Sequence, residues 1–142
     1  MPVAGGTLYT LAASAARTAG ANGTAVVLGG WRRAVVECSI TASATDAGDT
    51  LDVYVDVLAP DAVTWLNAVH FTQQAGNAAA KKMFAVLDSA SPGTSVIDVT
   101  ADAASGAVRP ALFGSSVRAR WAIADSGDGN SSHTFAVTMY AE

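Results

Sequence analysis

The sequence is short of charge. Only 14% of its 142 residues are charged, and the formal net charge is −4, whereas about a quarter of an average soluble domain is charged. Lysine and arginine never cluster beyond a pair, so the chain lacks the basic patch that attracts a phosphate backbone. We therefore expect no specific binding of nucleic acid.

Cysteine and histidine are equally scarce. Cys38 is the only cysteine, which excludes an intrachain disulfide, and its alternating run predicts a small buried side chain rather than a nucleophile. His70 and His133 belong to no H-x-H, H-x-x-x-H or C-x-x-C pattern, so the sequence predicts no zinc site. We expect both histidines to be packed or surface side chains.

Motifs of enzymes and membrane proteins are also missing. The sequence contains no G-x-S-x-G, no G-x-x-x-x-G-K-[ST] and no G-x-G-x-x-G, which are typical of serine hydrolases and nucleotide-binding sites. No apolar run approaches the roughly 18 residues of a membrane span, and no basic, uninterrupted signal segment opens the chain. We expect neither an enzyme nor a cofactor nor a membrane partner.

What the sequence has is alternation of apolar and polar residues, the period of a half-buried β-strand. The clearest run is Leu51–Leu58, in which every second residue is aliphatic. The same pattern predicts further strands over Thr24–Leu28, Ala34–Ala42, Thr64–Gln73, Lys81–Asp88 and Thr94–Thr100. No 3.6-residue period persists for three turns, so an α/β fold is disfavoured.

Two more runs end the chain, in the stretch Ser116–Tyr140. The first places Val117, Ala119 and Trp121 on one face, and the second places Phe135 and Val137 on one face. A segment rich in Gly, Asp, Asn and Ser separates them, which is the sequence form of an antiparallel hairpin. We expect the apolar face of this hairpin to be covered by a second sheet, because a lone hairpin is marginal in water.

The spacing of strands and turns predicts an all-β fold. About eight or nine strands indicate an antiparallel two-sheet sandwich, jelly-roll-like. An immunoglobulin-like sandwich is the alternative, although its Cys…Trp…Cys signature is absent. We expect residues 24–142 to form the single β-sandwich domain and residues 1–23 to form an extended N-terminal arm, flexible or exchanged with a neighbouring subunit; an edge strand is the other interpretation of this segment.

The strongest candidate for a metal site is the loop DSGDGN. Asp125, Asp128 and Asn130 place side-chain oxygens close together, as calcium requires. The D-x-[DN]-x-[DN]-G spacing is missing, however, and these residue types are those that a tight turn prefers. We therefore predict a turn and no metal site.

The best candidates for an acid–base pair are Asp52 and Asp56. They lie on one face of one strand, about 13 Å apart by the strand rise, which is too far for the carboxylate pair of a glycosidase. We interpret them as outward carboxylates on a solvated or subunit-facing sheet. Arg118 and Arg120 are their expected partners if the two strands meet, within one sheet or across a subunit boundary.

Aromatic residues give a second functional class. Trp31, Trp65, Trp121 and Tyr54 are able in principle to stack on sugars, as in a carbohydrate-binding jelly roll. Trp65 and Trp121 occupy alternating positions of the kind that face a core, which favours packing over sugar binding.

Residues 50–142 resemble small all-β virion proteins of tailed phages. The likeness lies in LDVYVDVLAPDAVTWLNAVHFTQ, PGTSVIDVTADAASGAVRP and VRARWAIADSGDGNSSHTFAVTMY, with an R-x-R-W strand and an S-x-T-F-x-V closing strand. The resemblance implies a capsid decoration protein, a homotrimer that binds the major capsid protein on the exterior of the virion and is made in the host cytoplasm. A tail or neck structural protein is the alternative within this group, and the resemblance implies no site residues.

Overall fold

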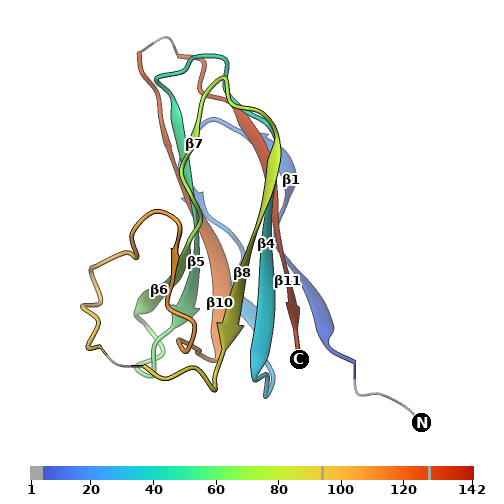
Figure 1. Cartoon of the computed structure of the whole chain (residues 1–142), viewed down its shortest axis with the longest axis vertical. Helices are drawn as coiled ribbons and strands as arrows, with labels where there is room; N and C mark the ends of the chain where they lie inside the picture. Colours follow the sequence, from blue (N-terminus) through green and yellow to red (C-terminus); the bar gives the residue numbers. More distant parts are fainter. Residues whose placement is uncertain (1–4, 94, 128) are drawn as a thin grey trace.

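The chain folds into two antiparallel β-sheets that face each other across one core (Figure 1). The computed structural model describes residues 5–93, 95–127 and 129–142. Strands make up all the regular structure of these residues. The expected fold class, an all-β antiparallel sandwich, is therefore confirmed.

Four long strands form one sheet, which we call the four-stranded sheet. They are β1 (Thr7–Arg17), β4 (Arg33–Ala42), β8 (Lys81–Asp88) and β11 (His133–Ala141). Their order in space is β1-β11-β4-β8, and each neighbouring pair is antiparallel. Strands β1 and β8 are therefore its two edges.

Three long and four short strands form the other sheet, which we call the seven-stranded sheet. The long ones are β5 (Thr50–Leu58), β6 (Trp65–His70) and β10 (Ser116–Ala124). The short ones are β2 (Ala21–Asn22), β3 (Val26–Val27), β7 (Gln74–Ala75) and β9 (Ala107–Val108). The order is β2-β10-β5-β6-β9, with β3 beside β10 and β7 beside β5.

Alternation predicts the core well. The apolar rows expected on four strands lie between the two sheets, where these residues are at most 8% exposed. These residues are Ala34, Val36, Cys38 and Ile40 on β4, Leu51, Val53, Val55 and Val57 on β5, Val117, Ala119 and Trp121 on β10, and Phe135, Val137 and Met139 on β11. Burial raises the pKa of the Cys38 thiol to about 12, which agrees with an inert side chain.

The predicted hairpin of the final two runs is wrong. Strand β10 pairs with β2, β3 and β5, whereas β11 pairs with β1 and β4, so the two strands belong to different sheets. The intervening loop, residues 125–132, crosses from one layer to the other. The apolar faces of the two strands meet across the core instead of side by side, and the rings of Trp121 and Phe135 pack edge-on with centroids 5.5 Å apart.

Most of the expected N-terminal arm lies in the sandwich. Residues 7–17 form β1, which pairs with β11 along its length, and the side chain of Leu11 is buried. Residues 21–22 form β2 in the opposite sheet. Residues 7–17 thus form an edge strand, as the second interpretation of this segment predicts. Residues 1–4 lie outside the described residues.

The strand expected over Thr94–Thr100 is wrong for residues 95–100, which contain one bend and a turn and no strand, with Val96 and Val99 exposed. The side chain of Asp98 accepts hydrogen bonds from the amide and the hydroxyl of Thr100. This local turn competes with pairing in a sheet. Residue 94 lies outside the described residues.

Candidate functional site

A charged network lies on the outer face of the seven-stranded sheet. Strands β5 and β10 pair so that Arg118 lies opposite Asp56. The Nε of Arg120 donates to Oδ2 of Asp56 at 2.8 Å, and the Nε of Arg118 lies 3.6 Å from the same oxygen. The arginine partners expected from the sequence are confirmed for Asp56, within one sheet, whereas the side chain of Asp52 contacts His70 and Gln73 instead.

The expectation of an outward, solvated carboxylate is wrong for Asp56. Its side chain is only 3% exposed, because residues 98–105, which we call the 98–105 loop, lie over it. The Nη2 of Arg120 donates to Oδ1 of Asp102 in this loop at 2.6 Å. Burial lowers the pKa of Arg120, but the hydrogen bonds and charges of Asp56 and Asp102 outweigh this and raise the pKa above its ordinary value.

His70 is held on both sides by acceptors. Its Nε2 lies 2.8 Å from Oδ1 of Asp52, and its Nδ1 lies 2.8 Å from the carbonyl oxygen of Ala103. The ring also stacks on Tyr54, with centroids 4.3 Å apart. Burial, followed by the charge of Asp52, raises the pKa of the Tyr54 hydroxyl. Both ring nitrogens of His70 therefore contact acceptors of the chain itself.

Further side chains anchor the 98–105 loop. The amide of Ala103 donates to Oδ1 of Asn67 at 2.8 Å, and Nη1 of Arg109 donates to the carbonyl oxygen of Ala101 at 2.8 Å. The roles of Asn67, Asp102 and Arg109 could not be predicted from the sequence, because the 98–105 loop has no periodicity that reveals what it covers. The opposite charges of this network pair with one another, and its hydrogen bonds hold the 98–105 loop against the sheet.

The candidate calcium loop is only partly described. Oδ1 of Asp125 accepts from the amide of Gly127 at 2.8 Å, as in a turn, and Nδ2 of Asn130 donates to Oγ1 of Thr45 at 3.1 Å. Asp128 lies outside the described residues, so the prediction of a turn without calcium stays a prediction there. Among the residues that are described, no three His, Cys, Asp or Glu side chains gather as metal ligands.

The aromatic side chains proposed for sugar binding contact their own chain. Nε1 of Trp121 donates to the carbonyl oxygen of Ala19 at 3.1 Å, and Nε1 of Trp31 donates to the hydroxyl of Tyr9 at 3.0 Å. The guanidinium of Arg118 lies 4.3 Å from the centre of the Trp65 ring. Each of these three tryptophan rings therefore has at least one contact with the chain's own residues.

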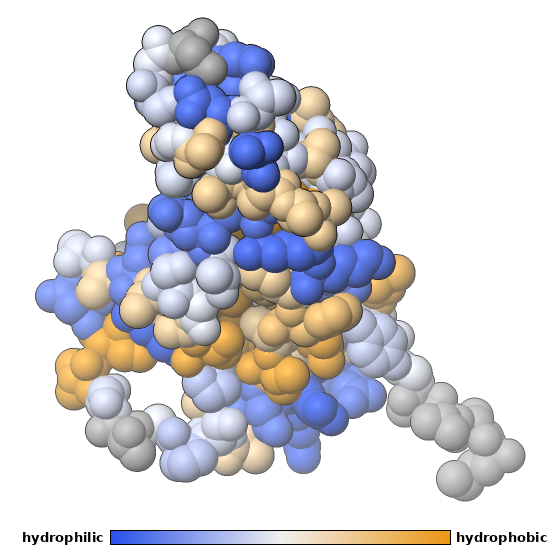
Figure 2. Space-filling view, turned by 45° about the horizontal axis from the view of Figure 1, so that its top comes forward, coloured by the Kyte–Doolittle hydropathy of each residue, from blue (hydrophilic) through white to orange (hydrophobic). Residues whose placement is uncertain are grey.

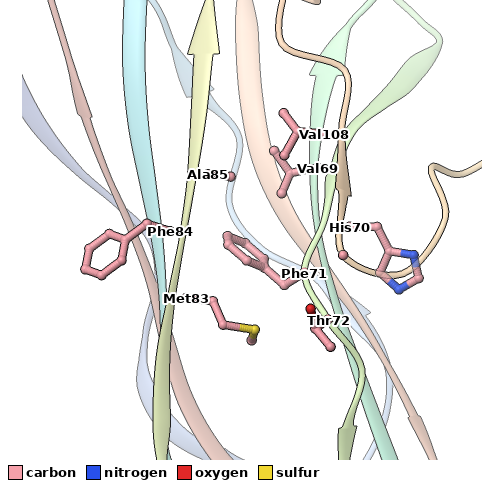
Figure 3. A pocket seen from close by; sticks show the side chains of 9 residues that line it. Val69, His70, Phe71, Thr72, Met83, Phe84, Ala85 and Val108 are labelled. Atoms are coloured by element: carbon pink, nitrogen blue, oxygen red, sulfur yellow. The ribbon is translucent and has the colours of Figure 1, made fainter.

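A cavity of about 290 Å³ opens between β8 and residues 69–72. In the close view, Phe71 and Met83 point into this space, whereas Phe84 and the ring of His70 point away from it (Figure 3). The lining is mixed, because His70 and Thr72 contribute to it beside Phe71 and Met83.

The outer face of the four-stranded sheet carries a row of large side chains in register, of which Leu8, Phe84, Val86 and Tyr140 are exposed and Val35 is half-buried. Leu8 on β1 lies opposite Tyr140, which lies opposite Val35, which lies opposite Val86 on β8. Leu8 is 71% exposed, and Phe84, at the next outward position of β8, is 64% exposed. We call these five residues the apolar row. In the space-filling view, hydrophobic residues gather in a broken band across the lower half of the molecule (Figure 2).

His133 gives the fold a dependence on pH. Its ring is fully buried at the start of β11, where Nδ1 accepts from the amide of Ala44 at 3.3 Å. Burial lowers the pKa of His133, and the nearby Asp49 opposes this only in part. Between the lowered pKa and the value near 6.5 of an unfolded chain, the unfolded state binds more protons than the folded state.

The free energy of unfolding is therefore expected to fall as the pH drops below about 6.5, by up to about 1.4 kcal/mol per pH unit from this residue. Urea denaturation of the wild type and of His133→Asn between pH 7.5 and 5 measures the difference in slope. Asparagine keeps an acceptor for the amide of Ala44 and does not titrate. Equal slopes for both proteins would contradict the assignment to His133.

Comparison with known proteins returns no family model, no curated protein and no solved structure that matches the chain. In the described ranges, no helix has the length and hydropathy to cross a membrane.

Proposed function

We propose that this chain is a structural protein of a phage virion, which associates with copies of itself and binds the outer surface of the capsid shell. The apolar row carries the proposal. Large apolar side chains that lie side by side and face water mark surfaces that other proteins cover. The row crosses all the strands of the four-stranded sheet, so it forms a surface rather than a single exposed residue.

The strand order supports the same proposal. The chain passes from β1 to β2, β4, β5, β6, β8, β10 and β11 with repeated crossings between the two sheets. We propose that this order is a jelly roll, the architecture that capsid proteins share with lectins and cupins. The lectin alternative has less support, because the three tryptophan rings contact the chain's own residues.

The partner in this proposal is the major capsid protein, and the mechanism is linkage. A protein that binds only the assembled shell stabilises that shell by mass action, without any catalysis. The resemblance to decoration proteins favours three copies in each assembly, placed on the capsid exterior after synthesis in the host cytoplasm.

Leu8→Thr tests the apolar row. Threonine suits an exposed strand, so the fold is expected to remain, while the loss of the aliphatic side chain from a covered surface should weaken association about tenfold. The measurement is mass in solution together with co-sedimentation with purified capsid shells. Val63→Thr is the matched control, because Val63 is 78% exposed in a turn away from the row.

Unchanged binding of Leu8→Thr to shells would count against the row, and a wild type that binds no shell would end the capsid proposal. Deletion of residues 1–23 is not a clean test of attachment. It removes β1 and the buried side chain of Leu11, so it is expected to destabilise the sandwich itself.

A further inference from the structure

Two side chains of β6 hold one residue of the 98–105 loop by both of its backbone groups. Oδ1 of Asn67 accepts from the amide of Ala103 at 2.8 Å, and Nδ1 of His70 lies 2.8 Å from the carbonyl oxygen of Ala103. The methyl group of Ala103 is buried as well. Ala103 is therefore a point at which the loop is fastened to the seven-stranded sheet.

The contact between His70 and the loop depends on the protons of the imidazole ring. A carbonyl oxygen accepts hydrogen bonds and donates none, so Nδ1 must carry a proton to bond with Ala103. Nε2 lies 2.8 Å from Oδ1 of Asp52, and a carboxylate likewise only accepts. A neutral imidazole has one N–H group, whereas the imidazolium has two. The closed loop therefore has the geometry of a doubly protonated, positively charged ring.

The carboxylate of Asp52 is placed to accept on both sides. Its second oxygen, Oδ2, accepts from Nε2 of Gln73 at 2.8 Å, so each oxygen faces one donor. The side chain of His70 is only 10% exposed, and a charge so far from water needs a partner of opposite sign. Asp52 supplies that partner at hydrogen-bond distance.

Further charges surround the ring. Tyr54 of β5 stacks on His70, and the charged groups that act on Tyr54 come from β5, β10 and the 98–105 loop: Asp52, Asp56, Arg120 and Asp102. The three carboxylates attract a charged imidazole ring, whereas the guanidinium repels it. Arg109 adds a second guanidinium where it donates to the carbonyl oxygens of Asn67 and Ala101. The carboxylate of Asp52 is the one that bonds to the ring itself.

We propose that His70 is a pH-sensitive latch on the 98–105 loop, closed when its ring carries two protons and released at Ala103 when the ring loses one. A hydrogen bond to a carboxylate is stronger than one to a neutral carbonyl, so the remaining proton stays on Nε2, facing Asp52. Nδ1 then presents a lone pair to the carbonyl oxygen of Ala103, and the two atoms repel each other. Rising pH therefore loosens the loop that covers the outer face of the seven-stranded sheet.

Amide exchange measures the latch. Between pH 5 and pH 8, the opening equilibrium at the amide of Ala103, corrected for intrinsic exchange at each pH, should rise about tenfold in the wild type, the size of one lost hydrogen bond. The amide of Phe71, which donates to Val53 within the sheet, is the reference and should not become more open as the pH rises. Titration of His133 acts in the opposite direction, because it destabilises the whole fold at low pH.

Two variants remove the switch in different ways. His70→Asn places an amide nitrogen near the position of Nδ1, so it keeps a donor for Ala103 and does not titrate. Asp52→Asn lets an amide donate to Nε2 of a neutral ring, which leaves the ring proton on Nδ1, facing Ala103. Both variants should make the exchange at Ala103 independent of pH. His133→Asn removes the other of the two histidines and is the control, which should keep the tenfold change.

Nitrogen NMR of the His70 ring reports the protons directly. It should show two protonated nitrogens while the loop is closed and a proton on Nε2 alone after release. A singly protonated ring in the closed state overturns the proposal, as does an opening equilibrium at Ala103 that is equal at pH 5 and pH 8. Full pH dependence in His70→Asn or Asp52→Asn, or its loss in His133→Asn, overturns it equally. None of these results bears on shell binding or on the apolar row.

Discussion

Replacing Asp56 with asparagine is expected to lower the free energy of unfolding by about 3–5 kcal/mol, the range measured when one partner of a buried ion pair is removed. The carboxylate of Asp56 is almost fully buried between Arg118, Arg120 and Asn67. Asparagine keeps the shape but removes the negative charge, so two guanidinium groups remain beneath the 98–105 loop with too little compensation. Urea denaturation monitored by tryptophan fluorescence measures the loss.

Asp102→Asn is the matched control for Asp56→Asn. It removes the other carboxylate that Arg120 contacts, but the side chain of Asp102 is 43% exposed, so we expect a loss of about 1 kcal/mol or less. Hydrogen exchange at the amide of Ala103, which donates to Asn67, should accelerate in Asp56→Asn before the rest of the sheet exchanges. Equal losses for the two variants would contradict the buried position of Asp56.

Phe135→Ala is expected to cost about 3–5 kcal/mol, as for other buried phenylalanines. The ring is fully buried in β11, packs edge-on against Trp121, and lies 4.4 Å from the guanidinium of Arg17. Its removal opens a hole where the two sheets and β1 meet. Because small domains are stable by only about 5–15 kcal/mol, this single change should bring the protein close to its unfolding threshold at 25 °C.

Phe84→Ala removes the same atoms from the exposed outer face of β8 and is the control for the core variant. At a protein concentration low enough to keep single copies, its free energy of unfolding should stay within about 0.5 kcal/mol of the wild type. The denaturant dependence of both variants should match the wild type, since the folded surface area changes little. A large loss in Phe84→Ala would mean that the outer face of β8 is packed in the single chain.

The predicted core was reliable because a strand with one buried face repeats every two residues. This repeat predicts β5 from its aliphatic residues Leu51, Val53, Val55 and Val57. The same repeat on β5 and β10 places Asp56 and Arg118 on the opposite face of the sheet. Strand β1 was harder to predict, because its pairing with β11 shifts register between Thr10 and Ala12 and again between Ala12 and Ala15. Such a bulge breaks the repeat, and a run of alanines gives little contrast between faces.

Neighbours in space could not be predicted from alternation. The repeat in Val117–Trp121 and in Phe135–Met139 indicates which side chains are buried. It cannot indicate whether the two strands pair in a hairpin or lie in two facing sheets, because both arrangements bury the same side chains. The burial of Asp56 was also hidden, since it depends on Asp102 and Ala103, which lie more than 40 residues further along the chain and in a segment without periodicity. Irregular segments that cover a sheet leave no local signature.

The pairing of β1 with β11 determines when the protein can complete its fold. Thr7 meets Ala141, and Arg17 meets His133, so β1 cannot pair until β11, about 120 residues later in the sequence, has been made. During synthesis β4 also lacks one neighbour until β11 has left the ribosome. Contacts between distant parts of a chain slow folding, and unpaired strands expose a nascent protein to aggregation. We therefore expect the sandwich to form only after β11 has left the ribosome, and nascent chains that lack β11 to be sensitive to protease along residues 7–17.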